Sequence, residues 1–94
     1  MIHFEWDSAK SQSNLAKHGI DFEEAKSVFS DEFARVIYDE NHSSSEDRFV
    51  ILGMSEKLRI LVVVHCFRQD DEVVRIISAR KATPNEQKQY KEFL

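Results

Sequence analysis

The stretch that decides the fold is EVVRIISARK at residues 72–81, which leads directly into ATPNE at residues 82–86. Its apolar residues are mostly β-branched, a composition typical of a strand buried within a sheet. If side chains alternate strictly along this strand, Arg75 and Arg80 lie on opposite faces of the sheet. Arginines in a buried strand need partners, so the function of these two cations is the central question.

Further strands are expected upstream, where the hydrophobic pattern has a period of two. They are predicted over residues 33–38, 48–54 and 58–67, and short polar links join the later ones to each other and to residues 72–81. Strands joined by such short links are antiparallel neighbours. Residues 61–64 (LVVV) are apolar on both faces, which indicates a central strand. Residues 2–5 are either a short strand or an extended lead-in.

Three helices are predicted from their capping residues. The signals are Asp7 or Ser8 with a stop at Gly19 for the first helix, Asp21 with Glu24 in a capping box for the second, and Thr83, Pro84 and Glu86 for the third. The polar residues 11–14 (SQSN) are poor core material, so the first helix is expected on the surface, held by Trp6, Ala9 and Leu15. The apolar side of the last helix is assigned to Tyr90, Phe93 and Leu94.

These elements predict an α+β fold with two N-terminal helices, an antiparallel sheet of about four strands and one C-terminal helix. A chain of 94 residues forms one domain, residues 1–94. The single cysteine, Cys66, excludes an internal disulfide and favours a cytoplasmic location. No leader sequence is recognised, and the longest apolar run, residues 60–64, is too short to span a membrane.

The charge is unevenly distributed along the chain. The net charge is −4, but residues 1–47 hold 4 Lys/Arg against 11 Asp/Glu, and residues 48–94 hold 9 against 6. The first half therefore carries −7 and the second +3. Such a chain can present a basic patch while remaining acidic overall. Lys88 and Lys91 are expected to do no more than solvate the surface.

Several classes of chemistry find no support in the sequence. The four histidines (His3, His18, His42 and His65) are scattered without paired metal-ligand spacing or a cysteine cluster. A glycine-rich phosphate loop and a Gly-x-Ser-x-Gly elbow are both absent. We therefore expect no cofactor and no metal.

What remains is a set of cations and proton-transfer groups: Lys17, His18, Arg48, His65, Arg75, Arg80, Glu86 and Tyr90. This set suits RNA cleavage in which the 2′-hydroxyl attacks the neighbouring phosphate. That reaction needs a base for the hydroxyl proton, an acid for the leaving 5′-oxygen and cations for the developing negative charge. Histidine and arginine are suited to these tasks.

Each candidate also has a structural explanation. Lys17 and His18 can be favourable charges at a helix C-terminus, and a histidine within an apolar strand is more often semi-buried than catalytic. Arg48 can pair with Glu46 or Asp47, Glu86 is a helix cap, and Tyr90 can belong to the core. Internal carboxylates can also hold Arg75 and Arg80. If they do, and no basic hollow lies nearby, the RNA hypothesis fails.

Motifs spread over nearly the whole chain carry a family resemblance. They are FEWD at 4–7, Lys10, Asn14, KHGI at 17–20, FEEA at 22–25, VF at 28–29, Asp31, Arg48, Gly53, LVVV at 61–64, RIISAR at 75–80, Ala82, Glu86 and Tyr90. In this combination they resemble the BrnT family of bacterial ribonuclease toxins from type II toxin–antitoxin modules, whose fold is like that of RelE.

The resemblance implies metal-independent RNA cleavage and growth arrest by the free toxin. It also implies a hetero-oligomer with a BrnA-like ribbon-helix-helix antitoxin, through which the pair would bind operator DNA. We assign catalysis to His18, Arg48, His65, Arg75 and Arg80, and substrate binding to Lys17, Lys81 and Tyr90. In this hypothesis Arg75 and Arg80, with Arg48, hold the scissile phosphate, and His18 or His65 exchanges protons. The alternative is a degenerate, non-enzymatic toxin that serves as a dimerisation and co-repressor module for its DNA-binding partner.

Overall fold

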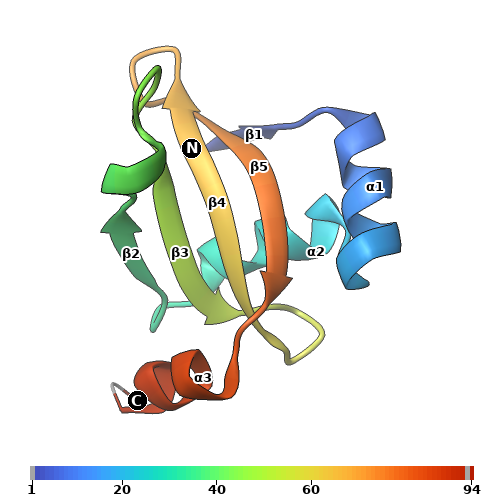
Figure 1. Ribbon diagram of the computed structural model, residues 1–94, viewed down its shortest axis with the longest axis vertical. Helices are drawn as coiled ribbons and strands as arrows, with labels where there is room; N and C mark the ends of the chain where they lie inside the picture. Colours follow the sequence, from blue (N-terminus) through green and yellow to red (C-terminus); the bar gives the residue numbers. More distant parts are fainter. Residues whose placement is uncertain (1, 93) are drawn as a thin grey trace.

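The computed structural model describes residues 2–92 and residue 94, and its framework is a five-stranded mixed sheet (Figure 1). The strands are β1 (His3–Glu5), β2 (Arg35–Tyr38), β3 (Phe49–Met54), β4 (Ile60–Arg68) and β5 (Val73–Lys81), in the order β1-β5-β4-β3-β2. The helices are α1 (Ser8–His18), α2 (Phe22–Ser27) and α3 (Pro84–Lys91), with 3-10 turns η1 (Val28–Ser30) and η2 (Glu40–His42). The α+β class and the C-terminal helix are as predicted.

The predicted sheet of about four antiparallel strands is wrong in two respects. Residues 3–5 form a fifth strand, so a strand precedes the two N-terminal helices, and β1 pairs in parallel with β5, with Phe4 opposite Val74. The remaining neighbours are antiparallel, and for β3, β4 and β5 this was expected from their short links. Strand β4 lies at the centre of the sheet, in agreement with its run of apolar residues.

Arg75 and Arg80 lie on the same face of the sheet, not on opposite faces. The cause is a β-bulge in β5: Val64 pairs with Ser78, but His65 pairs with Ile76, so Ile77 is an extra residue. The extra residue resets the alternation of side chains. Arg75 therefore stands opposite Cys66 and Arg80 opposite Val62, which are four residues apart on β4.

Helices α1 and α2 cover one face of the sheet, and the hydrophobic core lies between them and β3, β4 and β5 (Figure 1). The core residues are Ile20, Phe22, Ala25, Val28, Ile51, Leu61, Val63, Val74, Ile76 and Ala79. Gly53 is required where η1 packs on β3, because a Cβ there would lie 2.9 Å from side-chain carbons of Ala34 and Val28. The opposite face of the sheet stays open, except where α3 crosses its end.

Helix α1 is held by a residue that its polar sequence seemed to exclude from the interior. Asn14 is buried, and its amide group donates to the carbonyls of Ile20 and Ala79 and accepts from the Ala79 N–H. Asn14 thus provides hydrogen bonds to the backbone N–H and C=O of Ala79 on β5, beyond the residues of β5 that pair with β1. Leu15, expected to tether the helix, is 47% exposed.

The helix caps follow the prediction closely. Asp7, Asp21 and Thr83 are the N-caps, Gly19 ends α1 with a φ of 72°, and Thr83 with Glu86 forms a complete capping box. The capping box predicted for Glu24 is wrong in its second half, because the Glu24 carboxylate turns inward to Arg59 and Ser55. On α3, Tyr90 is buried but Leu94 is exposed, and Phe93 lies outside the described residues.

Candidate functional site

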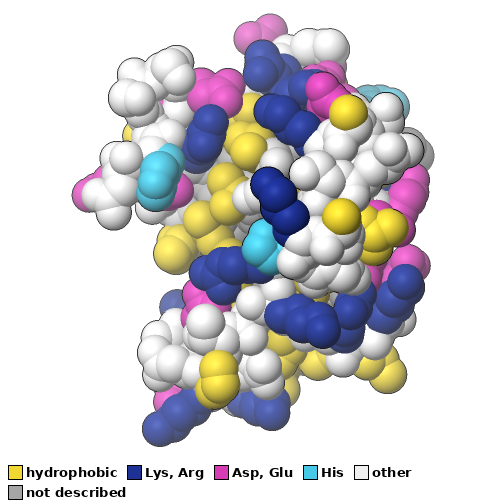
Figure 2. Space-filling view, turned by 45° about the vertical axis from the view of Figure 1, so that its right-hand side comes forward, with side chains coloured by type: hydrophobic (Ala, Val, Ile, Leu, Met, Phe, Trp, Pro, Cys, Tyr) yellow, Lys and Arg dark blue, Asp and Glu magenta, His cyan; other side chains and the backbone are white. Residues whose placement is uncertain are grey.

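A groove runs along the open face of the sheet between η2 and α3. Its floor is apolar, and its rim carries charged and polar groups from β2, η2, β5 and α3. Figure 2 shows hydrophobic side chains in a hollow of the surface, with Lys, Arg and His side chains along its border. The floor residues are Ile37, Val50, Leu52, Val62 and Val64, and the rim includes Arg35, Tyr38, Asp39, Glu40, His42, Arg80, Glu86 and Gln89.

Arg80 is fixed on this rim by Glu86, which lies in the first turn of α3. The two guanidinium nitrogens Nη1 and Nη2 donate to the two carboxylate oxygens of Glu86 at 2.7 and 2.9 Å, and Nη1 also reaches the Lys81 carbonyl at 3.3 Å. The hydrogen bond from Arg80 lowers the pKa of Glu86 to about 2, and the same contact raises the pKa of Arg80. Contacts with the described residues use three of the five guanidinium N–H groups, which leaves two for an anion.

The position of α3, and so of Glu86, depends on Tyr90 and Asp31. The Tyr90 hydroxyl donates to Asp31 Oδ2 at 2.6 Å, and the same oxygen accepts the Met54 N–H at 2.8 Å. Burial and the contact with Asp31 raise the pKa of Tyr90 to about 12. Tyr90, which we predicted to bind substrate, is thus buried and connects α3 to β3 through Asp31.

The groove contains a histidine–aspartate pair that sequence reasoning missed. His42 Nδ1 lies 3.0 and 3.2 Å from the two carboxylate oxygens of Asp39, which leaves Nε2 for a substrate. The His42 side chain is 68% exposed and that of Asp39 only 17%. The available signal was the Asp-x-x-His spacing within a polar loop, but His42 was considered only as a metal ligand, while proton transfer was assigned to His18 and His65.

Lys17 and His18 lie at the end of α1, close to the end of β5. The two elements run side by side in the same direction (Figure 1), and Asn14 joins α1 to Ala79. Residues three and four positions after Asn14 share its side of the helix, one turn further along. Lys17, His18 and Lys81 are exposed and surround the end of β5 that carries Arg80, and we call them the basic border. Lys81 pairs with the core residue Leu61 and so lies on the face of the sheet opposite to Arg80.

Arg48 and Arg75 lie in a different place, at the opposite end of the sheet. Arg75 Nη1 donates to Glu5 at 2.6 Å, Arg48 Nε lies 3.9 Å from Glu46, and Arg68 pairs with both glutamates. A neighbouring hollow is lined by Glu46, Asp47 and Asp71. Four residues separate Cys66 and Val62, the partners of Arg75 and Arg80 on β4, which places the two arginines about 13 Å apart along the sheet, each bound to a different glutamate.

His65, the second predicted proton-transfer residue, is fully buried in the core. Its ring contacts Phe29, Phe49 and Phe67, with the Phe29 ring centroid at 4.8 Å. Nδ1 lies 3.2 Å from the Val63 carbonyl, and Nε2 has no hydrogen-bond partner within the described part of the chain. Burial lowers the pKa of His65, although the contact with Val63 opposes that effect. His65 is therefore neutral and out of reach of substrate.

This burial makes the stability of the fold depend on pH. The unfolded chain takes up a proton at His65 below about pH 6.5, whereas the folded chain does so only at lower pH. The stabilisation is thus complete above pH 6.5 and is lost as the pH falls toward the folded pKa. Urea denaturation of the wild type at pH 7.5 and 5.5 should show the loss, at most about 1.4 kcal/mol per pH unit. His65→Leu should remove it, and the surface variant His3→Leu should retain it; equal slopes in all three proteins would contradict this explanation.

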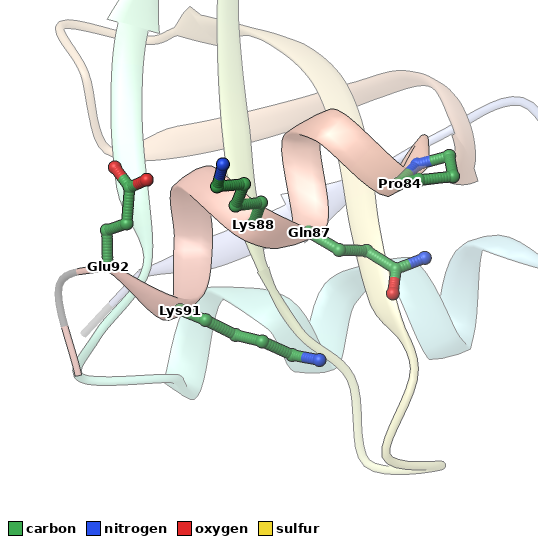
Figure 3. Close-up of a pocket in the computed structure, with 5 residues that line it drawn as sticks. All are labelled: Pro84, Gln87, Lys88, Lys91 and Glu92. Atoms are coloured by element: carbon green, nitrogen blue, oxygen red, sulfur yellow. The ribbon is translucent and has the colours of Figure 1, made fainter.

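The outer side of α3 carries no comparable chemistry. Figure 3 shows the outer side of α3, where Lys88 and Glu92 point to one side of the helix and Gln87 and Lys91 to the other. Among residues 2–92 and 94, no three His, Cys, Asp or Glu side chains converge in a metal-binding arrangement. None of the described helices is both long and apolar enough to cross a membrane.

A mixed sheet with one face closed by two helices, and a groove with an arginine and a histidine on the other, defines a small α+β protein with a candidate active site on its open face. The family model described as "Ribonuclease toxin, BrnT, of type II toxin-antitoxin system" matches residues 6–86. The chain therefore belongs to the BrnT family of ribonuclease toxins. Among solved structures, it is similar to the Brucella abortus ribonuclease toxin BrnT, with a TM-score of 0.66 and 29% identity, over 88% of this chain and 99% of that one. A search of curated proteins found no significant match.

Proposed function

We propose that this toxin is a metal-independent endoribonuclease whose active site is the groove on the open face of the sheet. The observation that supports it most is that Arg80 and the His42–Asp39 pair border the same groove. A fixed guanidinium with two available N–H groups can bind the non-bridging oxygens of a phosphate. An exposed imidazole oriented by a carboxylate can accept a proton.

The reaction that these groups suit begins with the 2′-hydroxyl of the RNA. Its oxygen attacks the adjacent phosphorus while Nε2 of His42 takes its proton, and Arg80 neutralises the charge that develops on the phosphate. The bond from phosphorus to the 5′-oxygen then breaks, and that oxygen takes a proton from solvent. His42 returns its own proton to the solvent. The products carry a 2′,3′-cyclic phosphate and a 5′-hydroxyl.

Other predicted site residues take different places in this proposal. Lys17 and His18 would contact the RNA backbone beyond the groove, and Lys81 would contact it past the end of β5, where the chain leaves the face that carries Arg80. Arg48 and Arg75 are left out because they lie at the other end of the sheet, where Arg75 is bound to Glu5 and Arg48 lies near Glu46. His65 and Tyr90 support the fold from the interior.

The family also implies an antitoxin that neutralises the chain and an RNA substrate. We propose that the antitoxin is a BrnA-like ribbon-helix-helix protein, that the two form a hetero-oligomer in the cytoplasm, and that the antitoxin carries the toxin to operator DNA. A short basic reading frame beside the gene would support this assignment.

Cleavage of a defined RNA by the purified chain in excess chelator tests the chemistry. We expect cleavage in EDTA, with a 2′,3′-cyclic phosphate on the upstream product detected by mass spectrometry. His42→Gln should lower the single-turnover rate by about 100-fold or more, the usual contribution of a general base. His18→Gln, which removes only a backbone contact, should lower it a few-fold.

The outcomes separate the two histidines and the role of metal. If His18→Gln loses the cleavage rate and His42→Gln keeps full activity, His18 is the general base. The groove is then not the active site. Activity abolished by EDTA and restored by Mg²⁺ would refute the metal-independent reaction. Thermal unfolding of each variant checks that the fold is kept.

One observation favours the alternative of a non-enzymatic module. Glu5 and Glu86 already hold Arg75 and Arg80, which meets half of the condition for rejecting the RNA hypothesis. The groove beside Arg80 and its basic border are the reason to retain that hypothesis. Expression of the chain without its partner distinguishes the two, because a binding-only module would not arrest growth.

A further inference from the structure

Strand β2 forms an outer edge of the sheet and carries exposed apolar side chains. Val36 is 53% exposed, Ile37 62% and Tyr38 46%, and Figure 1 shows β2 at the edge of the sheet away from β1. Within the described residues no strand pairs with its outer side. Proteins often protect such edges with charged residues, proline or a bulge, but β2 has only Arg35 at its start, no proline, and a regular register with β3.

The backbone of β2 offers hydrogen bonds at this edge. The N–H of Asp39 donates to the Arg48 carbonyl, so Asp39 and, two residues before it, Ile37 direct their backbone groups toward β3. The alternate residues Val36 and Tyr38 then direct their N–H and C=O groups outward. An extended segment pairing there would form backbone hydrogen bonds and cover the apolar side chains.

The charges around β2 indicate what kind of segment fits. Residues 31–47 hold six carboxylates and one cation, Arg35. Glu32 and Glu40 lie just before and just after the strand and are exposed. A second copy of this chain would bring the same two glutamates against its own acidic border, which disfavours self-pairing at this edge. A basic polypeptide is the occupant that the charges favour.

We propose that β2 is the docking edge for a basic extended segment of the antitoxin, which adds a sixth strand to the sheet. This rests on the antitoxin partner proposed above but not on the chemistry of cleavage. The added strand would lie beside Ile37, which is both on β2 and in the floor of the groove, and close to His42. Neutralisation then follows from obstruction of the groove by the bound segment.

Val36→Pro is the sharpest test, because it removes an outward N–H without removing a hydrogen bond to β3. Proline is tolerated on edge strands when its nitrogen faces outward. We expect the affinity for the antitoxin encoded beside this gene, measured by calorimetry, to fall about tenfold or more. Val36→Thr keeps the N–H and the β-branched shape and should bind like the wild type. Both variants should still cleave RNA.

Charge and exchange measurements complete the test. Glu32→Lys should weaken binding several-fold at low salt, and the difference should vanish at high salt. In the wild-type complex the Val36 and Tyr38 amides should become protected from hydrogen exchange. The proposal is overturned if Val36→Pro binds normally, if these amides stay unprotected, or if RNA or self-association protects them instead. Loss of RNA cleavage in wild type, with the binding results unchanged, would refute only the proposed chemistry.

Discussion

Replacement of Arg80 by alanine is expected to lower the rate of RNA cleavage by 100-fold or more while the protein stays folded. Two hydrogen bonds to the Glu86 carboxylate hold the guanidinium of Arg80 in the groove, and they leave N–H groups for phosphate. Loss of one fixed donor to a developing anion costs about 10²–10³ in rate. Arg80→Lys keeps the charge but not the planar fork, so it should recover only part of the activity. Single-turnover cleavage and growth arrest are the two readouts.

In Arg80→Ala the carboxylate of Glu86 loses its partner, and the effect of this unpaired charge needs its own control. Without its partner, Glu86 would place a bare negative charge in the groove, and this alone would repel RNA. Glu86→Gln removes that charge but keeps a side chain that can complete the capping box with Thr83. If Arg80→Ala/Glu86→Gln regains wild-type activity, Arg80 serves only to neutralise Glu86, and its assignment to the phosphate is wrong. Lys88→Ala, on the outer side of α3, is the matched loss of a cation and should have little effect.

The starts of the helices could be predicted well from the sequence, because a helix cap depends on residues that are close together in the chain. Asp7, Asp21 and Thr83 begin the helices as expected, since each cap bonds to an N–H two or three residues away. Glu86 was identified as a cap for the same reason. Its second contact, with Arg80, was not foreseen because it depends on how the chain turns from β5 into α3.

The features that could not be predicted from the sequence are contacts between residues far apart in the chain and the β-bulge in β5. The bulge at Ile77 lies in a uniform β-branched run, so nothing local marks the change that puts Arg75 and Arg80 on one face. Asn14 was set aside as polar, yet its partner Ala79 is 65 residues away. Only the position of the η2 segment relative to the sheet shows that the His42–Asp39 pair faces Arg80.

The largest effect on stability is expected at Arg59, which is the partner of a buried carboxylate. Glu24 is 1% exposed, and its oxygens accept from Arg59 Nε at 2.9 Å, from Arg59 Nη2 and from the Ser55 hydroxyl at 2.7 Å. Arg59 also donates to the Gly19 carbonyl at the end of α1. One guanidinium thus joins α1, α2 and the turn between β3 and β4.

Arg59→Ala should lower the free energy of unfolding by about 3 kcal/mol, the lower end for removal of one partner of a buried pair, because Arg59 is itself partly exposed. Urea denaturation at pH 7 measures this, with Lys57→Ala in the same turn as the surface control. Burial raises the pKa of Glu24, but the hydrogen bonds from Arg59 and Ser55 outweigh it and the pKa is lowered. The stabilisation is therefore complete above about pH 4.5 and is lost in more acidic solution, where wild type and Arg59→Ala should converge.

A double variant, Glu24→Leu/Arg59→Met, should recover most of the loss, since an apolar pair of similar volume often replaces a buried ion pair. If the double variant is as unstable as Arg59→Ala, the loss arises from the contact with Gly19 and not from an unpaired buried charge.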